Sequence, residues 1–169
     1  AIAATPLKNE HIKERVLFFE PFVGYIPNNH RLTSKKTLEV SDLDIDDMLL
    51  LEDGHCFRDG VLNLCKGLKT KDHDEFQLES GSFEMLVKLA NEGMGMTLLP
   101  YLHTLDLKEK EHGNLHFFNE PSPAREVSLI YHKSELKIQI IDALHNIISG
   151  IIRGAIAFQN VQIISPVAT

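Results

Sequence analysis

The feature that most constrains the fold is an alternation of short apolar runs and helix-spaced apolar residues in the middle of the chain. Residues 48–51 read MLLL, a continuous apolar run of the kind that buried parallel strands show. Residues 57–68 then carry apolar side chains at helical spacing, and residues 76–78 read as a second strand. The unit repeats with a helix over residues 83–90 and a strand over residues 96–99. This pattern predicts an α/β fold with mostly parallel sheets and helices on both faces.

Four further strands are predicted outside this repeat, at residues 15–19, 22–26, 115–118 and 127–131. Pro21 and Pro27 are expected to end the first two, and a proline turn at residues 121–123 is expected to separate the last two. Residues 138–152 predict a helix whose apolar stripe is wider than one core contact requires, which indicates a partner surface. Residues 155–169 predict either an extra strand or a frayed end.

Charge and hydropathy exclude several classes of function. The formal net charge is −7, and the basic residues are scattered in short groups, so this segment is not expected to grip DNA itself. No apolar run approaches the roughly 18 residues that a membrane helix requires. The first residues lack the basic and long apolar character of a secretory signal. A cytoplasmic location without membrane contact is therefore expected.

The two cysteines have different surroundings in the sequence. A reducing cytoplasm disfavours a structural disulfide, which leaves reactive or buried thiols. Cys56 lies where a predicted strand passes into a helix, so free backbone N–H groups and the helix dipole face its sulfur. His55 and Arg58 flank it, and all of these features favour the thiolate, which is the nucleophile. Cys56 is therefore predicted to be a reactive cysteine.

The spacing between Cys56 and Cys65 limits how they could bond. Nine residues of helix rise about 13.5 Å, whereas a disulfide needs Cα atoms no more than about 7 Å apart. The bond would therefore require most of residues 57–64 to unwind, which would make it a conformational switch. Two unlinked cysteines and a metal role are the alternatives that the residues leave open.

Two segments carry a resemblance to a known family. Residues 51–59 read LEDGHCFRD, with Cys65 nine positions after Cys56, and this closely resembles the sensing loop of the OxyR family of LysR-type transcription regulators. Residues 86–100, which end in GMGMTLLP, resemble the helix-turn-strand of LysR-type effector domains. The second pattern is common to the wider superfamily, so it supports a two-lobed fold like that of periplasmic binding proteins and not peroxide sensing. The cysteine loop carries the specificity.

The resemblance implies a redox role for both cysteines. In the family, the first cysteine of this loop is oxidised by hydrogen peroxide to a sulfenic acid, which condenses with the second. Carried over, Cys56 is the peroxidatic residue and Cys65 the resolving residue, with no cofactor and no metal. The expected function is a reversible, peroxide-driven switch that controls oxidative-stress genes.

Four residues are expected to support the sensing loop on the same resemblance. His55 would hydrogen-bond near the sulfur of the reduced form, and Arg58 would add positive potential and tie down the loop. Asp59 matches an acidic residue that helps to hold peroxide or water. Arg125 matches an arginine placed behind the sensing cysteine, although a surface arginine at the start of a strand is the simpler interpretation.

The resemblance also predicts the domain organisation. Residues 17–123 resemble the complete second lobe of the regulatory domain, and residues 1–16 and 124–169 resemble what remains of the first lobe. The winged helix-turn-helix of the family does not appear in this sequence, so the chain is expected to be part of a longer regulator. Hydroxyl residues that complete the family's peroxide pocket are expected in the part that does not appear. Promoter DNA, RNA polymerase and a second copy, in a dimer or tetramer, are the expected partners.

Other classes of function remain as alternatives. A small-ligand effector domain of another LysR-type regulator would use the strand ends and a helix start at Ser80 and Ser82 for an anion. A thiol peroxidase would need rapid recycling, which the nine-residue spacing does not favour. His103, His112 and His116 lack the spacing of a metal site. The chain is therefore not expected to be an enzyme.

Overall fold

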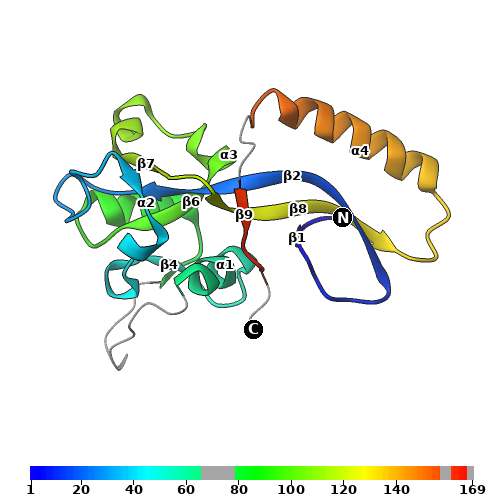
Figure 1. Ribbon diagram of the computed structural model, residues 1–169, viewed down its shortest axis with the longest axis horizontal. Helices are drawn as coiled ribbons and strands as arrows, with labels where there is room; N and C mark the ends of the chain where they lie inside the picture. The colour runs from blue at the N-terminus through cyan, green and yellow to red at the C-terminus, as the bar shows by residue number, and fades with distance from the viewer. Residues whose placement is uncertain (66–78, 157–160, 167–169) are drawn as a thin grey trace.

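The computed structural model describes residues 1–65, 79–156 and 161–166 (Figure 1). Its main sheet has the order β1-β8-β2-β7-β3, with β6 also pairing with β2 and β9 with β8, and β4 and β5 form a second, two-stranded sheet. The elements in chain order are β1 (Ile2–Thr5), β2 (Ile12–Tyr25), β3 (Thr37–Leu38), η1 (Val40–Asp42), η2 (Ile45–Asp47), β4 (Leu50–Leu51), α1 (Cys56–Cys65), β5 (Glu79–Ser80), α2 (Phe83–Asn91), β6 (Thr97–Pro100), α3 (Tyr101–Thr104), η3 (Glu109–Asn114), β7 (Leu115–Phe118), β8 (Ser122–His132), α4 (Ile138–Arg153) and β9 (Val161–Ile163).

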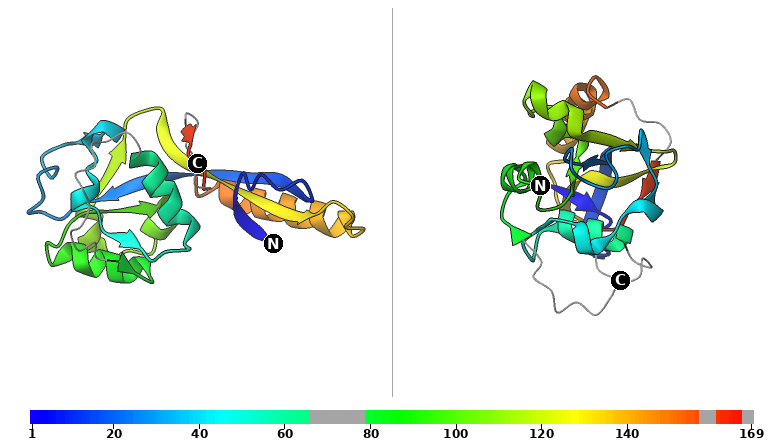
Figure 2. Two further views of the ribbon diagram at one scale, coloured as in Figure 1. Left: turned by 90° about the horizontal axis from the view of Figure 1, so that it is seen from below. Right: turned by 90° about the vertical axis from the view of Figure 1, so that its left-hand side faces the viewer.

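The molecule has a lobe and an arm. The lobe holds α1, α2, α3 and strands β3 to β7, and the arm holds β1, α4 and the adjoining parts of β2 and β8 (Figures 1 and 2). Strand β2 runs through both parts and pairs with β8 along the arm as a ribbon, with α4 on one side of the ribbon and α1 on the other side, where the ribbon meets the lobe (Figure 1). The site described below lies where this ribbon enters the lobe.

Strand β2 is continuous, so the prediction that Pro21 ends a strand was wrong. It pairs antiparallel with β8 from Ile12 to Pro21, and then with β6 from Phe22 to Tyr25. Pro21 thus stands where β2 changes partners, at the end of the β8 ladder, and a proline is tolerated at such a position because its missing N–H interrupts little pairing. The apolar run continues on both sides of it into the core.

The sheets are mixed, whereas mostly parallel pairing was predicted. The pairs of β2 with β6, β7 and β8 and of β1 with β8 are antiparallel. The pairs β3–β7, β4–β5 and β8–β9 are parallel. Local apolar patterns do not specify the direction of the partner strand, and β2 runs opposite to most of its neighbours.

The predicted strand–helix–strand repeat is confirmed within the lobe. Strand β4 pairs in parallel with β5, which follows it in the chain after α1. A parallel bridge also joins Met48, just before β4, to Met96, which follows α2 in the chain. Helix α2 begins at its N-cap Ser82, whose hydroxyl accepts a hydrogen bond from the Met85 N–H at 3.3 Å. The predicted strand at residues 76–78 and the end of the predicted helix at residues 66–68 lie outside the described residues.

Two apolar cores correspond to the two parts. The lobe core includes Phe22, Phe57, Leu86 and Leu98, all at most 4 % exposed. The arm core is much smaller and centres on Leu17, Leu129 and Ile141. The apolar stripe of α4 is wider than its contact with the arm core, as predicted, and more of it is exposed than the wide stripe alone indicated. Its exposed members are Ile138, Ile140, Leu144, Ile147 and Ile151.

Within the predicted tail, residues 161–163 form a strand, and residues 157–160 and 167–169 lie outside the described residues. Strand β9 pairs in parallel with the first residues of β8, and the Ile164 N–H donates to the Ala124 carbonyl at 2.7 Å. Ile164 is 9 % exposed and joins the lobe core. The Asn63 amide of α1 donates to the Ser165 carbonyl at 2.9 Å, so the tail is bonded to the helix that carries both cysteines.

Candidate functional site

Cys56 occupies the first turn of α1, at the carboxyl end of β4. The connecting residues 52–55 are exposed, and Gly54 has φ +86°, a left-handed conformation that glycine adopts without steric cost. The Glu52 N–H donates to the Ser80 carbonyl at 3.0 Å, which fixes the start of this loop against β5. Cys56 itself is exposed. The sequence prediction for its place in the fold is confirmed.

Cys65 lies at the other end of the same helix and is buried, only 5 % exposed. Burial, together with the negative charges of Asp44 and Asp47, raises the pKa of the Cys65 thiol to about 11. Both cysteines are free. Because α1 is helical from one cysteine to the other, their Cα atoms are separated by about 13.5 Å of helix rise, beyond the reach of a disulfide. One thiol is open to reagents, and the other is kept protonated inside the lobe.

Arg58 ties the loop to the neighbouring strand. Its Nη2 lies 2.7 Å from a Glu79 carboxylate oxygen of β5, and its Nη1 lies 3.5 Å from a carboxylate oxygen of Asp53. The Arg58 side chain is 15 % exposed, so it holds these carboxylates from a mostly buried position. The structure therefore places Arg58 where the predicted tether should be, with its charge directed at two carboxylates.

Arg125 lies behind the start of α1 rather than on a free surface. Its guanidinium carbon is 5.2 Å from the centroid of the Phe57 ring, and Phe57 directly follows Cys56. Its Nε and Nη2 lie 2.8 and 2.6 Å from one carboxylate oxygen of Glu20 in β2. The simpler interpretation of Arg125 as a surface residue is therefore wrong.

Phe57 anchors the first turn of α1 in an aromatic cluster. Its ring centroid lies 5.0 Å from that of Phe22 and 5.1 Å from that of Phe83, in tilted and edge-on arrangements that aromatic pairs favour. Phe83 in turn contacts His103 at 5.1 Å. The residue next to the exposed cysteine is thus fixed from several sides.

Glu20 is a site residue that sequence reasoning missed. Its carboxylate is 2 % exposed, and its other oxygen accepts a hydrogen bond from the Leu102 N–H at 3.0 Å. The signal was a single acidic residue within the otherwise apolar run FFEPFV at residues 18–23. A carboxylate in a buried strand requires a cationic or hydrogen-bonding partner, which here is Arg125.

The remaining predicted residues have simpler surroundings. His55 is exposed, and its carbonyl accepts a hydrogen bond from the Asp59 N–H at 3.3 Å in the first turn of α1. The Ser82 hydroxyl caps α2, and the Ser80 hydroxyl lies 3.4 Å from both the Ser82 N–H nitrogen and its carbonyl oxygen. The two serines therefore serve the β5–α2 turn, and their hydroxyls are engaged there.

Within residues 1–65, 79–156 and 161–166, no group of three or more His, Cys, Asp or Glu side chains could hold a metal ion. No helix in that part of the chain is both long and apolar enough to cross a bilayer. His103 belongs to the aromatic cluster, and the buried His116 donates through Nδ1 to the Lys35 carbonyl at 2.9 Å.

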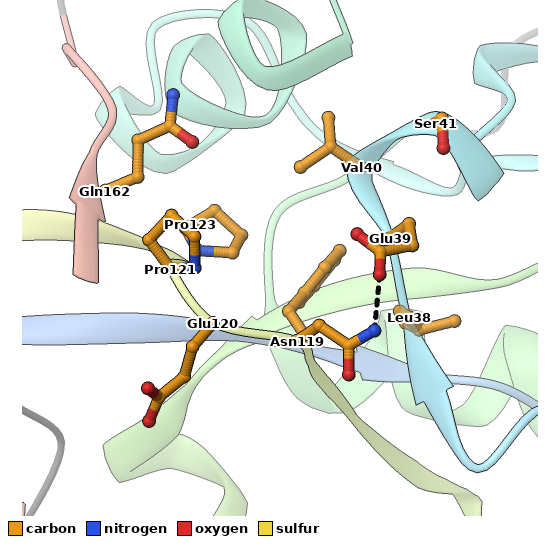
Figure 3. A pocket seen from close by; sticks show the side chains of 10 residues that line it. Leu38, Glu39, Val40, Ser41, Asn119, Glu120, Pro121, Pro123 and Gln162 are labelled. Carbon is orange, nitrogen blue, oxygen red and sulfur yellow. Dashed lines mark hydrogen bonds between the residues drawn. The ribbon is translucent and has the colours of Figure 1, made fainter. Parts of the chain in front are cut away.

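A shallow polar hollow of about 260 Å³ lies between β3, the β7–β8 turn and β9 (Figure 3). Glu39 accepts a hydrogen bond from the Asn119 amide at its rim, and Gln162 of the tail completes the lining (Figure 3). None of the site residues predicted from the sequence lines this hollow, although the predicted turn residues Pro121 and Pro123 do.

Comparisons with known proteins agree with this fold. The LysR substrate binding domain family matches residues 1–149, and the chain therefore belongs to that family. This membership confirms the predicted fold class.

Named relatives are OxyR regulators. The hydrogen peroxide-inducible genes activator of Pectobacterium carotovorum subsp. carotovorum is 32% identical over 133 residues, which are 78% of this chain and 43% of that protein. The reduced form of the OxyR regulatory domain from Pseudomonas aeruginosa is 30% identical, covers 88% of this chain and 70% of its own, and superposes with a TM-score of 0.69. OxyR from Porphyromonas gingivalis shares the fold, with a TM-score of 0.80 at 24% identity over 96% of this chain and 74% of its own. The resemblance to OxyR is thus confirmed, and the chain spans less than half the length of the curated relative.

Proposed function

We propose that this chain is the redox-sensing regulatory domain of a DNA-binding transcription regulator that responds to hydrogen peroxide. The observation that carries the proposal is the placement of the two cysteines on one helix. Cys56 is exposed at its start, and Cys65 is buried at its end. The names of the relatives, hydrogen peroxide-inducible genes activator and OxyR, supply the oxidant.

The proposed chemistry has two steps. In the first, the Cys56 thiolate attacks hydrogen peroxide, forming a sulfenic acid and releasing hydroxide. In the second, the Cys65 sulfur attacks the sulfenic sulfur and a disulfide forms. The sulfenic hydroxyl leaves as water after it takes up the Cys65 thiol proton. The second step requires α1 to open, because the intact helix holds the cysteines apart. Bond formation therefore changes the shape of the lobe.

The neighbouring residues suit these steps. Arg58 holds the loop before α1, and Arg125 supports its first turn from behind through Phe57. His55 and Asp59 lie one residue before and three residues after Cys56, where we propose that they flank the reacting sulfur and the bound peroxide. No cofactor takes part in this chemistry.

At the level of the whole protein, we propose a cytoplasmic homo-oligomeric activator, a dimer or tetramer, that acts at promoters with RNA polymerase. DNA binding would belong to a domain outside this chain. We assign residues 17–123 to the second lobe of the regulatory domain, and residues 1–16 and 124–156 to the first. The exposed apolar stripe of α4 and the small core of the arm support that assignment. Residues 161–166, expected in the first lobe, are assigned to the second, because Ile164 joins the core of the lobe that holds α1.

Mass spectrometry of the thiols tests the proposal. The purified chain, treated with one equivalent of hydrogen peroxide, should lose two hydrogens through a Cys56–Cys65 bond. Cys65→Ser should stop at an oxygenated Cys56, and Cys56→Ser should leave the Cys65 thiol intact. Two unreactive thiols would contradict the sensor function for this chain, and the same test on the longer protein would show whether a preceding segment completes the site.

A small-ligand effector domain is the second candidate, and the family to which the chain belongs favours it through its description as a substrate binding domain. Such a domain would keep its ligand response in Cys56→Ser, whereas the sensor would lose its response. Regulation that survives this substitution would therefore select the second candidate.

A further inference from the structure

Among the described residues, Glu20 is the most deeply buried charged side chain, and the redox chemistry described above does not use it. Its carboxylate is 2 % exposed and accepts hydrogen bonds from Arg125 and from the Leu102 N–H. Removing a charge from water is costly unless it is paired, so Glu20 fixes Arg125 in one place. We propose that Glu20 is a positioning residue that stabilises the dithiol form of the switch by holding Arg125 against Phe57.

The argument follows a chain of contacts from β2 to the cysteine. Glu20 fixes the Arg125 guanidinium with two nitrogen–oxygen contacts of 2.8 and 2.6 Å, and this guanidinium lies 5.2 Å from the centroid of the Phe57 ring. A cation fixed over an aromatic ring in a mostly buried place stabilises the ring in that position. Phe57 directly follows Cys56, so this contact stabilises the helical start of α1.

The disulfide form cannot keep this arrangement intact. A Cys56–Cys65 bond requires most of residues 57–64 to leave the helix, and Phe57 is the first residue of that segment. The Glu20–Arg125–Phe57 contacts therefore stabilise the dithiol form more than the disulfide form. Weakening them shifts the redox equilibrium toward the disulfide, which is a consequence specific to a positioning role.

The inference rests on the proposed function and is tested by the redox equilibrium rather than by the reaction with peroxide. The chain is equilibrated in glutathione buffers, where two cysteine thiols and one oxidised glutathione give one protein disulfide and two reduced glutathiones. The disulfide fraction is measured by alkylation and mass spectrometry. We expect Glu20→Gln, which keeps the shape and removes the charge, to raise the equilibrium constant for the disulfide about tenfold, a shift of about 30 mV. Glu20→Asp keeps the charge and provides a second variant. Its equilibrium constant for the disulfide should lie between those of the wild-type chain and Glu20→Gln.

Two further variants separate positioning from general destabilisation. Tyr25, five residues after Glu20 on β2, is buried, and its hydroxyl donates to the Asn91 side-chain oxygen at 2.7 Å; Tyr25→Phe removes this bond and should lower the melting temperature without moving the potential. In a Phe57→Leu background, Glu20→Gln should have little further effect on the potential, because the contact through which it acts is already lost.

The outcomes are distinguishable. Equal potentials for the wild-type chain and Glu20→Gln would overturn the inference and leave the proposed function standing. A shift in Glu20→Gln that persists in full in the Phe57→Leu background would overturn the route through Phe57. A wild-type chain that never forms the bond in any buffer would overturn the proposed function, and the inference with it.

Discussion

The state of Cys65 leads to a quantitative prediction about its reactivity. Its thiol is 5 % exposed, and burial, with Asp44 and Asp47, raises its pKa from 9.0 to about 11. The thiolate is the form of cysteine that attacks alkylating reagents. At pH 8, roughly one thiol in ten is ionised at a pKa of 9.0 and roughly one in a thousand at a pKa of 11. Folding should therefore slow the alkylation of Cys65 by at least about 100-fold.

The assay is iodoacetamide labelling at pH 8, followed by mass spectrometry, on the Cys56→Ser variant so that only Cys65 reports. The same variant in concentrated urea supplies the unfolded rate. Lack of access to the buried sulfur adds to the charge effect, so the measured ratio should exceed the value obtained from the pKa alone. A folded rate within tenfold of the unfolded rate would refute the reasoning, because it would mean that the end of α1 opens readily without oxidation.

Three further predictions concern stability. Because the pKa of Cys65 is higher in the folded chain than in the unfolded chain, the unfolded chain loses this proton first as the pH rises. The free energy of unfolding should therefore fall between pH 9 and pH 11 by up to about 3 kcal/mol. Urea titration of Cys65→Ala over the same pH range should lack this decrease. Gly93→Ala should lower the free energy of unfolding by more than about 1 kcal/mol, because Gly93 has φ +80° and an added Cβ would lie 2.4 Å from the side-chain amide nitrogen of Asn29. Gly150→Ala in α4, where an added Cβ meets open space, should instead raise the melting temperature. Equal changes in the two variants would contradict this prediction. Ile164→Ala should lower the free energy of unfolding by about 2 kcal/mol or more in a denaturant titration, because Ile164 packs into the lobe core. Ile163→Ala, one residue earlier and 39 % exposed, should lower it clearly less.

The sequence was sufficient to predict the strand–helix–strand units of the lobe. Residues 48–51 form a continuous apolar run, and residues 96–99 form one interrupted only by Thr97. The helix between residues 83 and 90 has a capping serine before it and helical apolar spacing within it, so local patterns were informative. Strand direction was not predictable, because an apolar run is equally compatible with parallel and antiparallel neighbours. Pro21 was misleading, since its effect depends on where β2 changes partners, and this depends on distant segments of the chain.

The candidate site was predictable only where its residues are adjacent in sequence. Cys56 and Arg58 belong to one short loop, so their proximity followed directly from the sequence. Glu20 and Arg125 are separated by 105 residues, and their pairing depends on the register of β2 against β8. Their separation explains why Glu20 was missed and why the position of Arg125 could not be derived from local sequence.

The continuous β2–β8 ribbon determines how the arm can move relative to the lobe. The two strands pair from Ile12 to Pro21 and from Ala124 to His132, with one register shift between Val16 and Phe18, so the two parts are joined by paired backbone. Relative motion must therefore bend or twist two strands together. From Glu20 to Ile12 the strand extends on the order of 27 Å, so a bend of about ten degrees near Glu20 would move the far end of the ribbon by several ångströms. The paired ribbon thus acts as a two-stranded lever.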